Sequence, residues 1–502
     1  MRKILIANRG EIAVRIIRAC RDLQIATVAV YSDCDRGARH VRMADEAVAI
    51  GGNPPADSYL RIDRIVDAAN ATGAHGVHPG YGFLAENEEF AAACRDAGLT
   101  FIGPRPEAIA LMGSKTAARA AAIAAGVDVV PGTETPLTAD AGEDEIARIA
   151  DRIGYPVMVK AVAGGGGKGM RVVGSRDELS GAVRAARSEA GAAFGDSAIY
   201  LERRLSRPRH IEVQVLADHH GTVLPFIERE CSIQRRHQKV VEESPSAIVS
   251  ADLRNRLAAA AASVAASVGY TNAGTMEFLL DAAGRFYFLE MNTRLQVEHP
   301  VTEMVTGVDL VEWQIRIARG EPLTIEPAQA LTPRGHAIEC RVYAEDPDSG
   351  FLPSPGRITD VRPPSGPGIR DDSGVEAGDE VPVYYDALIS KLVAWGSSRQ
   401  QAVSRMRRAV AEYDVRGIRT TVPFFRWLLD QPVFRDATFD TEFLDTLLQQ
   451  RRGKSFSEPE SSLQEVALIA AALHAVRGTA SPPGEILDSA WTQQAKRESL
   501  RE

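Results

Sequence analysis

The feature that most restricts the fold of this chain is a glycine-rich run, residues 164–169, which lies between two apolar segments. The run matches the G-x-G-x-x-G pattern, but a dinucleotide-binding loop opens a helix, whereas residues 170–173 predict a strand. A P-loop does not fit either, because Lys168 is followed by glycine and no helix begins there. The remaining interpretation is a flexible turn between two strands, whose backbone N–H groups can fold over phosphates.

A lysine close to this run favours phosphate binding over a mobile surface hairpin, which is the alternative. Lys160 ends the apolar segment 157–159, where an ammonium group is costly unless an anion accompanies it. A triphosphate is such an anion. The sequence therefore predicts that nucleotide phosphates bind between the glycine run and Lys160.

The hydrophobic pattern divides the chain into several regions, and 502 residues are too many for one core. Residues 1–113 alternate strands with helices, which predicts a doubly wound, Rossmann-like α/β domain. Residues 114–331 contain mainly strand signals, several of them hairpins, and predict an α+β domain. Residues 332–447 form a third unit, and residues 448–502 are interpreted as a linker with an appended helix.

The composition argues against several classes of protein. A formal net charge of -9 implies no broad basic surface for nucleic acid. The longest run of small apolar residues, 257–268, is far shorter than the roughly 20 residues of a membrane span. The five cysteines are scattered without a C-x-x-C pair, which fits a reducing cytoplasm and neither a zinc site nor a disulfide framework. Residues 1–8 enter a strand at once, so no signal peptide is expected.

Two carboxylates are predicted to face each other across a hairpin. Two strand segments flank a turn at residues 283–284, and a two- or four-residue turn there sets Glu277 opposite Glu290. Like charges in this position repel each other, and a divalent cation would remove the conflict. Asn292 lies two residues further on the same face. Two carboxylates and an amide oxygen suit Mg²⁺, whereas a solvated polar face is the alternative.

Further polar candidates surround this hairpin in the sequence. In residues 210–215 polar and apolar side chains alternate, so the polar ones, among them His210, are expected to face a cleft or water. Residues 228–239 are dense in charges of both signs, which indicates either a surface loop or an anion site. Arg294 and Glu298 follow the predicted metal strand and are candidates for an oxyanion clamp and a general base.

Together these segments resemble biotin carboxylases over roughly residues 1–447. The matching stretches are residues 6–13, 78–84, the glycine run with 169–171, 234–239 and 290–300. The last two are long and highly specific. The resemblance implies a pre-ATP-grasp domain, an ATP-grasp domain with a mobile lid at about residues 131–203, and a biotin carboxylase C-terminal domain.

The resemblance also implies roles for individual residues. The implied ATP-binding residues are Lys115, Lys160, Gly166, Gly167, Glu202, Leu205, His210, Gln234 and His237. The implied ligands of Mg²⁺ or Mn²⁺ are Glu277, Glu290 and Asn292, in agreement with the hairpin register. The implied bicarbonate and biotin site consists of Tyr81, Lys239, Arg294, Gln296, Val297 and Arg341. The implied catalytic residues are Lys239, Arg294, Arg341 and the base Glu298.

The reaction implied by this resemblance is carboxylation of biotin on a carrier protein, with ATP and bicarbonate as substrates and carboxyphosphate as intermediate. The sequence contains no Met-Lys-Met of a biotinyl domain, so we expect a biotin carboxyl carrier protein and a carboxyltransferase subunit to act in trans. We expect a cytoplasmic homodimer that serves an acyl-CoA carboxylase, as in fatty acid biosynthesis. The helix predicted at residues 463–476 is expected to dock a partner subunit.

Three alternatives remain at this point. The chain could belong to a two-subunit pyruvate carboxylase, since the partner chooses the final acceptor. Another ATP-grasp ligase, of the carbamoyl-phosphate or purine type, should lack the 294–298 segment and Arg341. A non-catalytic nucleotide-binding subunit would not need Lys239, Arg294 and Glu298, and their presence argues against it.

Overall fold

Strands flank the glycine run on both sides in the computed structural model. The structure describes residues 1–502 except 134, 139, 163–169, 196, 457–460 and 479–502. The run itself therefore lies outside the described residues. Strands β6 (Val157–Ala161) and β7 (Arg171–Val173) pair antiparallel on either side of it, and no helix opens after it. The predicted strands on either side of the run are confirmed, and they pair antiparallel.

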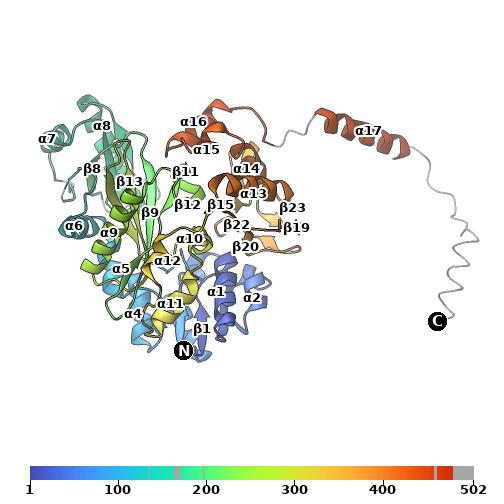
Figure 1. Ribbon diagram of the computed structural model, residues 1–502, viewed down its shortest axis with the longest axis horizontal. Helices are drawn as coiled ribbons and strands as arrows, with labels where there is room; N and C mark the ends of the chain where they lie inside the picture. Colours follow the sequence, from blue (N-terminus) through green and yellow to red (C-terminus); the bar gives the residue numbers. More distant parts are fainter. Residues whose placement is uncertain (134, 139, 163–169, 196, 457–460, 479–502) are drawn as a thin grey trace, which may run out of the picture. The chain divides into compact units, whose positions relative to one another are not determined.

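The N-terminal residues form a parallel sheet of the order β3-β2-β1-β4-β5. Figure 1 shows β1 next to the N-terminus, with α1 and α2 nearby. Its strands are β1 (Lys3–Ile6), β2 (Ala26–Ser32), β3 (Glu46–Gly51), β4 (Gly76–His78) and β5 (Thr100–Phe101). Its helices are α1 (Gly10–Asp22), α2 (Arg39–Met43), α3 (Ile62–Ala71), α4 (Glu88–Asp96) and α5 (Pro106–Gly113). Residues 4–6 of β1 are fully buried, as expected for a strand covered on both faces. The predicted α/β fold of this part is confirmed.

A small separate sheet, of the order β7-β6-β8, contains the two strands beside the glycine run. Strand β8 (Ile199–Arg203) completes it, and helices α7 (Glu143–Ile153) and α8 (Arg176–Phe194) pack on it. Helix α6 (Lys115–Ala124) precedes this layer along the chain. The hydroxyl of Ser114 accepts a hydrogen bond from the backbone N–H of Ala117, which confirms the predicted N-cap of α6.

The central feature is a nine-stranded sheet, of the order β14-β13-β9-β11-β12-β15-β22-β20 with β10 (Val223–Pro225) paired to β9. Its other strands are β9 (Arg209–Ala217), β11 (Arg229–Arg235), β12 (Gln238–Ser244), β13 (Asn272–Leu280), β14 (Phe286–Asn292), β15 (His336–Tyr343), β20 (Ile369–Ser373) and β22 (Leu388–Gly396). Because β12 pairs with β15, one continuous sheet joins strands on either side of the border predicted at residues 331–332.

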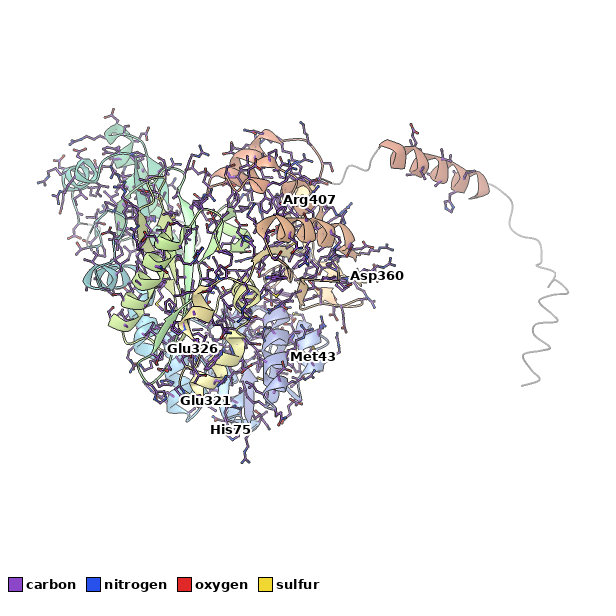
Figure 2. The ribbon with its side chains drawn as sticks, in the orientation of Figure 1. Met43, His75, Glu321, Glu326, Asp360 and Arg407 are labelled. Carbon is purple, nitrogen blue, oxygen red and sulfur yellow. The ribbon has the colours of Figure 1, made fainter. Side chains whose placement is uncertain are left out.

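Helices cover this central sheet and connect it to the N-terminal layer. Their bounds are α9 (Ala251–Ser267), α10 (His299–Thr306), α11 (Leu310–Ala318), α12 (Pro327–Leu331), α13 (Arg399–Glu412), α14 (Val422–Leu428), α15 (Pro432–Arg435) and α16 (Phe443–Gln450). Short strands complete the C-terminal part: β16 (Glu345–Asp346), β17 (Leu352–Pro353), β18 (Gly356–Arg357), β19 (Asp360–Arg362), β21 (Glu380–Val381) and β23 (Asp414–Arg416). Helix α11 shares a core with β1 and α1, and Figure 2 shows Glu321, which follows α11, at the same end of the molecule as His75.

The charged segment 228–239 is not a surface loop. It forms β11 and the start of β12, and every residue of β11 is buried. Its charges are accommodated because partners of opposite sign lie on neighbouring elements, chiefly on β9. The fully buried Arg229 pairs with Glu212, and Glu230 accepts a hydrogen bond of 2.9 Å from Arg209. Density of charge indicates exposure only where no such partner lies within reach.

The hairpin of β13 and β14 confirms the predicted pairing of Glu277 with Glu290, but the predicted turn length is wrong. Leu280 pairs with Phe286, so five residues, 281–285, connect the strands. A β-bulge between Glu277 and Phe278 then adds one residue on β14, at Leu289. The bulge compensates the odd-numbered connection and restores the register at the carboxylates.

Residues 455–502 form a second unit, separate from residues 1–454. The helix predicted at residues 463–476 is present as α17 (Ser461–Gly478). Four large apolar side chains on it are 60–70% exposed: Val466, Leu468, Ile469 and Leu473. In the described part of the chain, no helix combines the length and the apolar character that a membrane-spanning segment requires.

Candidate active site

The ammonium group of Lys239 lies among three buried carboxylates. Its Nζ donates to Glu212 at 2.6 Å, to Glu277 at 2.8 Å and to Glu298 at 2.7 Å. These three carboxylates with Lys239 are called the Lys239 cluster below. Burial acts to lower the pKa of Lys239, but the carboxylates raise it well above its ordinary range. Lys239 is therefore charged, and it links strands β9, β12 and β13 to the loop that precedes α10.

Glu298 is held as a carboxylate between two cations. Its second oxygen accepts a hydrogen bond of 2.9 Å from Nη2 of Arg341, whose Nε donates to Glu242 at 2.6 Å. Burial acts to raise the pKa of Glu298, but Lys239, Arg341 and the nearby Arg229 lower it well below its usual range. The predicted base is thus ionised, as a group that accepts a proton must be.

Arg294 is oriented by hydrogen bonds on three sides. Its Nε donates to Glu86 at 2.8 Å, while its Nη atoms donate to Gln296 Oε1 and to Asn292 Oδ1, each at 3.1 Å. Glu86 also accepts from the backbone N–H of Thr293 at 2.9 Å. Glu86, which comes from the N-terminal layer, was not predicted from the sequence. Its position two residues after the family-like stretch 78–84 was the available signal.

The carboxylates predicted to bind metal repel each other in the way the sequence suggested. Burial raises the pKa of Glu290, and the negative charge of Glu277 raises it further. Burial acts to raise the pKa of Glu277 as well, but Lys239 and His210 lower it. This repulsion, between oxygen ligands, fits a divalent cation such as Mg²⁺. Asn292 donates its Nδ2 to Glu277 at 2.9 Å, and its oxygen accepts a hydrogen bond of 3.1 Å from Arg294 Nη2.

The two predicted phosphate lysines influence each other electrostatically. Burial lowers the pKa of Lys160 to about 8, and the positive charge of Lys115 contributes to this shift. Lys160 also forms an ion pair with Glu202 of β8. The protein itself therefore supplies an anion for this buried lysine, so the cost of burial alone does not require a phosphate. Gly166 and Gly167, the predicted lid residues, lie outside the described part of the chain.

Of the other predicted contacts, some lie at or next to the Lys239 cluster, and for the others only their place in the chain is described. His210 and Gln296 adjoin the Lys239 cluster, because His210 Nε2 lies 3.1 Å from Glu277 and Gln296 donates to the same carboxylate at 3.3 Å. Gln234 Nε2 lies 3.3 Å from His210 Nδ1. His237 lies in the turn between β11 and β12, and Leu205 is half-buried just after β8.

Two residues of the predicted bicarbonate and biotin site, Val297 and Tyr81, lie near a further lysine, Lys391. The carbonyl of Val297 accepts a hydrogen bond of 3.1 Å from Lys391, whose ammonium lies 5.4 Å from the ring centre of Tyr81. Like Glu86, Arg229 and Glu242 had been given no role from the sequence. Glu212 had been given none either, although it carried a signal as one of the alternating polar residues of β9.

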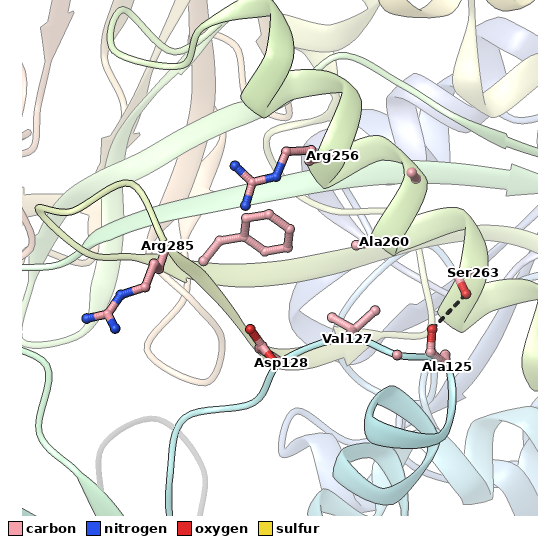
Figure 3. Close-up of a pocket in the computed structure, with 10 residues that line it drawn as sticks. Ala125, Val127, Asp128, Arg256, Ala260, Ser263 and Arg285 are labelled. Atoms are coloured by element: carbon pink, nitrogen blue, oxygen red, sulfur yellow. Dashed lines mark hydrogen bonds between the residues drawn. The ribbon is translucent and has the colours of Figure 1, made fainter.

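A cavity of about 430 Å³ lies elsewhere (Figure 3). Residues of α9, among them Arg256 and Ser263, line it together with residues 125–128 and Arg285. Helix α9 packs on the apolar side chains of β9 and β13, which alternate with the carboxylate-bearing positions and so point to the other face of the sheet. This cavity is therefore not part of the candidate active site.

Comparisons with known proteins match the chain in three consecutive parts. The family model described as biotin carboxylase, N-terminal domain, matches residues 1–109. The model described as carbamoyl-phosphate synthase L chain, ATP binding domain, matches residues 114–326. The biotin carboxylase C-terminal domain model matches residues 339–446.

Curated relatives and solved structures match over nearly the same length. The biotin carboxylase of Nostoc sp. is 54% identical over 445 residues, which cover 89% of this chain and 99% of that protein. A pyruvate carboxylase subunit of Methanothermobacter thermautotrophicus is 52% identical over 451 residues, 90% of each chain. The biotin carboxylase domain of Hydrogenobacter thermophilus 2-oxoglutarate carboxylase, a dimer with MgADP, ADP and bicarbonate, superposes with a TM-score of 0.86 at 47% identity. That match covers 91% of this chain and 99% of the solved one.

Proposed function

Because this chain belongs to the biotin carboxylase family, we propose that the Lys239 cluster with Arg294 and Arg341 is where bicarbonate is activated and biotin is carboxylated. The activity is that of an ATP-dependent ligase, which uses ATP, Mg²⁺ and bicarbonate to carboxylate biotin on a carrier protein. The observation that carries the proposed location is an ionised, fully buried Glu298 held between Lys239 and Arg341.

In the first proposed step, bicarbonate binds to Arg294 and Lys239 beside Glu298. Its negative charge competes for the cations that now pair with Glu298, and this makes the carboxylate a stronger base. Glu298 takes the proton of bicarbonate, and the freed oxygen attacks the γ-phosphorus of ATP, which yields carboxyphosphate and ADP. Lys115 and Lys160 offset the phosphate charge. Mg²⁺, when bound by Glu277, Glu290 and Asn292, adds further charge neutralisation.

In the second proposed step, carboxyphosphate breaks down to CO₂ and phosphate within the site. The phosphate takes the N1′ proton of biotin, and the ureido oxygen then carries negative charge. Arg341 stabilises this anion, which attacks CO₂ and forms carboxybiotin. Closure of the predicted lid at about residues 131–203 would keep water from the short-lived intermediate.

The proposal extends to the organisation of the enzyme. The borders at residues 113–114, 331–332 and 447–448 divide the chain into pre-ATP-grasp, ATP-grasp, C-terminal and appended parts. The chain forms a cytoplasmic homodimer that receives biotin on a separate carrier and hands carboxybiotin to a separate carboxyltransferase. The solved Hydrogenobacter relative is a dimer, which supports the dimeric state. An acyl-CoA is the proposed final acceptor, and the similarity to a pyruvate carboxylase subunit makes pyruvate the second candidate.

The change Arg294→Ala tests the proposed site. It removes the guanidinium group beside Glu298, so bicarbonate-dependent ATP cleavage with free biotin should be nearly abolished. The control Arg256→Ala removes an exposed arginine from the distant cavity and should keep the wild-type rate. Wild-type turnover by Arg294→Ala would refute the assignment, and ATP cleavage stimulated by ammonia or glutamine, not by biotin, would indicate a different ATP-grasp ligase.

A further inference from the structure

Lys391 of β22 is fully buried and contacts all three major parts of the fold. Its Nζ lies 3.1 Å from a carboxylate oxygen of Glu11 in α1. The same Nζ donates a hydrogen bond of 3.1 Å to the carbonyl oxygen of Val297, in the loop before α10. One ammonium group from the C-terminal strand thus contacts the N-terminal layer and the loop that carries Glu298.

The position of Lys391 in the sheet places it beside the proposed biotin side. It pairs directly with Arg341 of β15 and with Asp372 of β20. Directly paired residues of neighbouring strands point to the same face, so Lys391 and Arg341 share the face on which Glu298 lies. The ring of Tyr81 lies 5.4 Å from the ammonium. Lys391 therefore adjoins three proposed site residues and reaches a fourth, Glu298, through the peptide of Val297.

Stability alone does not explain a lysine at this place. A fully buried ion pair is often no more stabilising than well-packed apolar side chains of the same volume. The pairing with Glu11 is also incomplete, because burial raises the pKa of Glu11 to about 7 although Lys391 acts to lower it. A directed hydrogen bond, in contrast, is something that an apolar side chain does not supply. The bond to Val297 is such a contact.

The Val297 carbonyl belongs to the peptide unit that joins Val297 to Glu298. The peptide bond is planar, so a donor that fixes the carbonyl of Val297 also fixes the backbone N–H of Glu298. Gln296, one residue earlier, accepts a hydrogen bond of 3.1 Å from Arg294. The backbone from Gln296 to Glu298 is therefore fixed by Arg294 at one end and by Lys391 at the Val297 carbonyl.

We propose that Lys391 is a positioning residue for bicarbonate activation. It fixes the orientation of the Val297 peptide, so that Glu298 and the Val297 backbone face the bound bicarbonate. This inference rests on the proposed function of the Lys239 cluster. The contacts of Lys391 are with protein groups, the Glu11 carboxylate and the Val297 carbonyl, and this role requires no contact with bicarbonate or ATP. Its removal should therefore affect bicarbonate use selectively.

The decisive experiment is steady-state kinetics of Lys391→Met in the full chain with free biotin. We expect KM for bicarbonate to rise about tenfold and kcat to fall, with KM for ATP within about twofold of wild type. The matched control Glu11→Gln removes the charge partner but leaves the bond to Val297, so its KM for bicarbonate should stay within about twofold. An unchanged KM for bicarbonate in Lys391→Met would overturn the proposal, as would an equal rise of both KM values or an equal effect of Glu11→Gln.

A second variant keeps the test decisive if Lys391→Met does not fold. Lys391→Gln retains a polar side chain that is too short to reach Val297, and it should show the same selective rise in KM for bicarbonate. Glu298→Gln separates this inference from the proposed function. If Glu298→Gln is inactive while folded Lys391 variants bind bicarbonate normally, only the role of Lys391 is wrong. If Glu298→Gln itself is fully active, the proposed site is wrong.

Discussion

The contact between Glu86 and Arg294 leads to the sharpest quantitative prediction. Glu86 accepts hydrogen bonds from Arg294 Nε at 2.8 Å and from the backbone N–H of Thr293 at 2.9 Å. Among the described residues, it is the carboxylate that forms an ion pair with Arg294 within 4.0 Å. The change Glu86→Ala removes both bonds, together with a longer one of 3.4 Å from the Thr293 hydroxyl, so the guanidinium can move away from its present orientation.

The expected loss follows from these two bonds. A hydrogen bond that involves a charged group contributes about 1.5–3 kcal/mol. The side chain of Glu86 is 41% exposed, so water and salt weaken the interaction, and we take about 2 kcal/mol for both bonds together. That corresponds to a loss of about 30-fold in kcat/KM for bicarbonate. Glu86→Gln keeps the shape and one good acceptor but loses the charge, and should lose only about fivefold.

The assay is bicarbonate-dependent ATP cleavage with free biotin, measured over a range of bicarbonate concentrations. Glu107→Ala is the matched control. Glu107 forms an exposed ion pair of 3.2 Å with Arg95, and this pair is not part of the proposed site. This control should stay within about twofold of wild type. If Glu86→Ala keeps more than about a third of the wild-type kcat/KM, the idea that Glu86 orients Arg294 is refuted.

Three further predictions concern the metal, the phosphate lysine and the appended helix. Glu277→Gln and Glu290→Gln should each raise the Mg²⁺ concentration needed for half-maximal ATP turnover; an unchanged metal dependence in both would contradict the metal assignment. The pKa of Lys160 is lowered by burial to about 8, so its ammonium is lost as pH rises through that value, and KM for ATP should be about tenfold higher at about pH 9 than at about pH 7. Lys160→Arg should flatten this profile, and a wild-type profile that is already flat would argue against a phosphate contact. Deletion of residues 455–502 should abolish binding of a partner subunit but leave carboxylation of free biotin unchanged, and intact complex assembly would dismiss the docking role of α17.

Local patterns predicted much of the fold and the elements that carry the site. The alternation of apolar residues was sufficient for β1, β2 and α1, and for the strands on both sides of the glycine run. The pairing of Glu277 with Glu290 was also predicted correctly, although the prediction assumed a turn of two or four residues. A bulge at Leu289 compensates the five-residue connection. Residue spacing in one strand carries no signal for a bulge. A bulge is defined by two residues of one strand that oppose one residue of its partner, so it can be recognised only when the pairing of both strands is known.

The burial of residues 228–235 in the charged segment was beyond local reasoning. Charge density normally marks a surface, and only the neighbouring strand β9 reveals that Arg229 and Glu230 have partners. The same limit applies to Glu86, which is separated from Arg294 by 208 positions. Contacts of this range depend on the order of strands in the sheets and on how the layers pack, and neither leaves a periodic trace in the sequence.

The sequence by itself determined the strand–glycine–strand element, the facing carboxylates and, through long family-like stretches, the biotin carboxylase family. These follow from short-range geometry and from residue identity. Only the tertiary structure decided that Lys239 joins Glu212, Glu277 and Glu298, and that Lys391 reaches Val297 from another part of the fold. The physical reason is that buried charges are stable only in pairs, and the partners are chosen by the three-dimensional packing of strands distant in sequence.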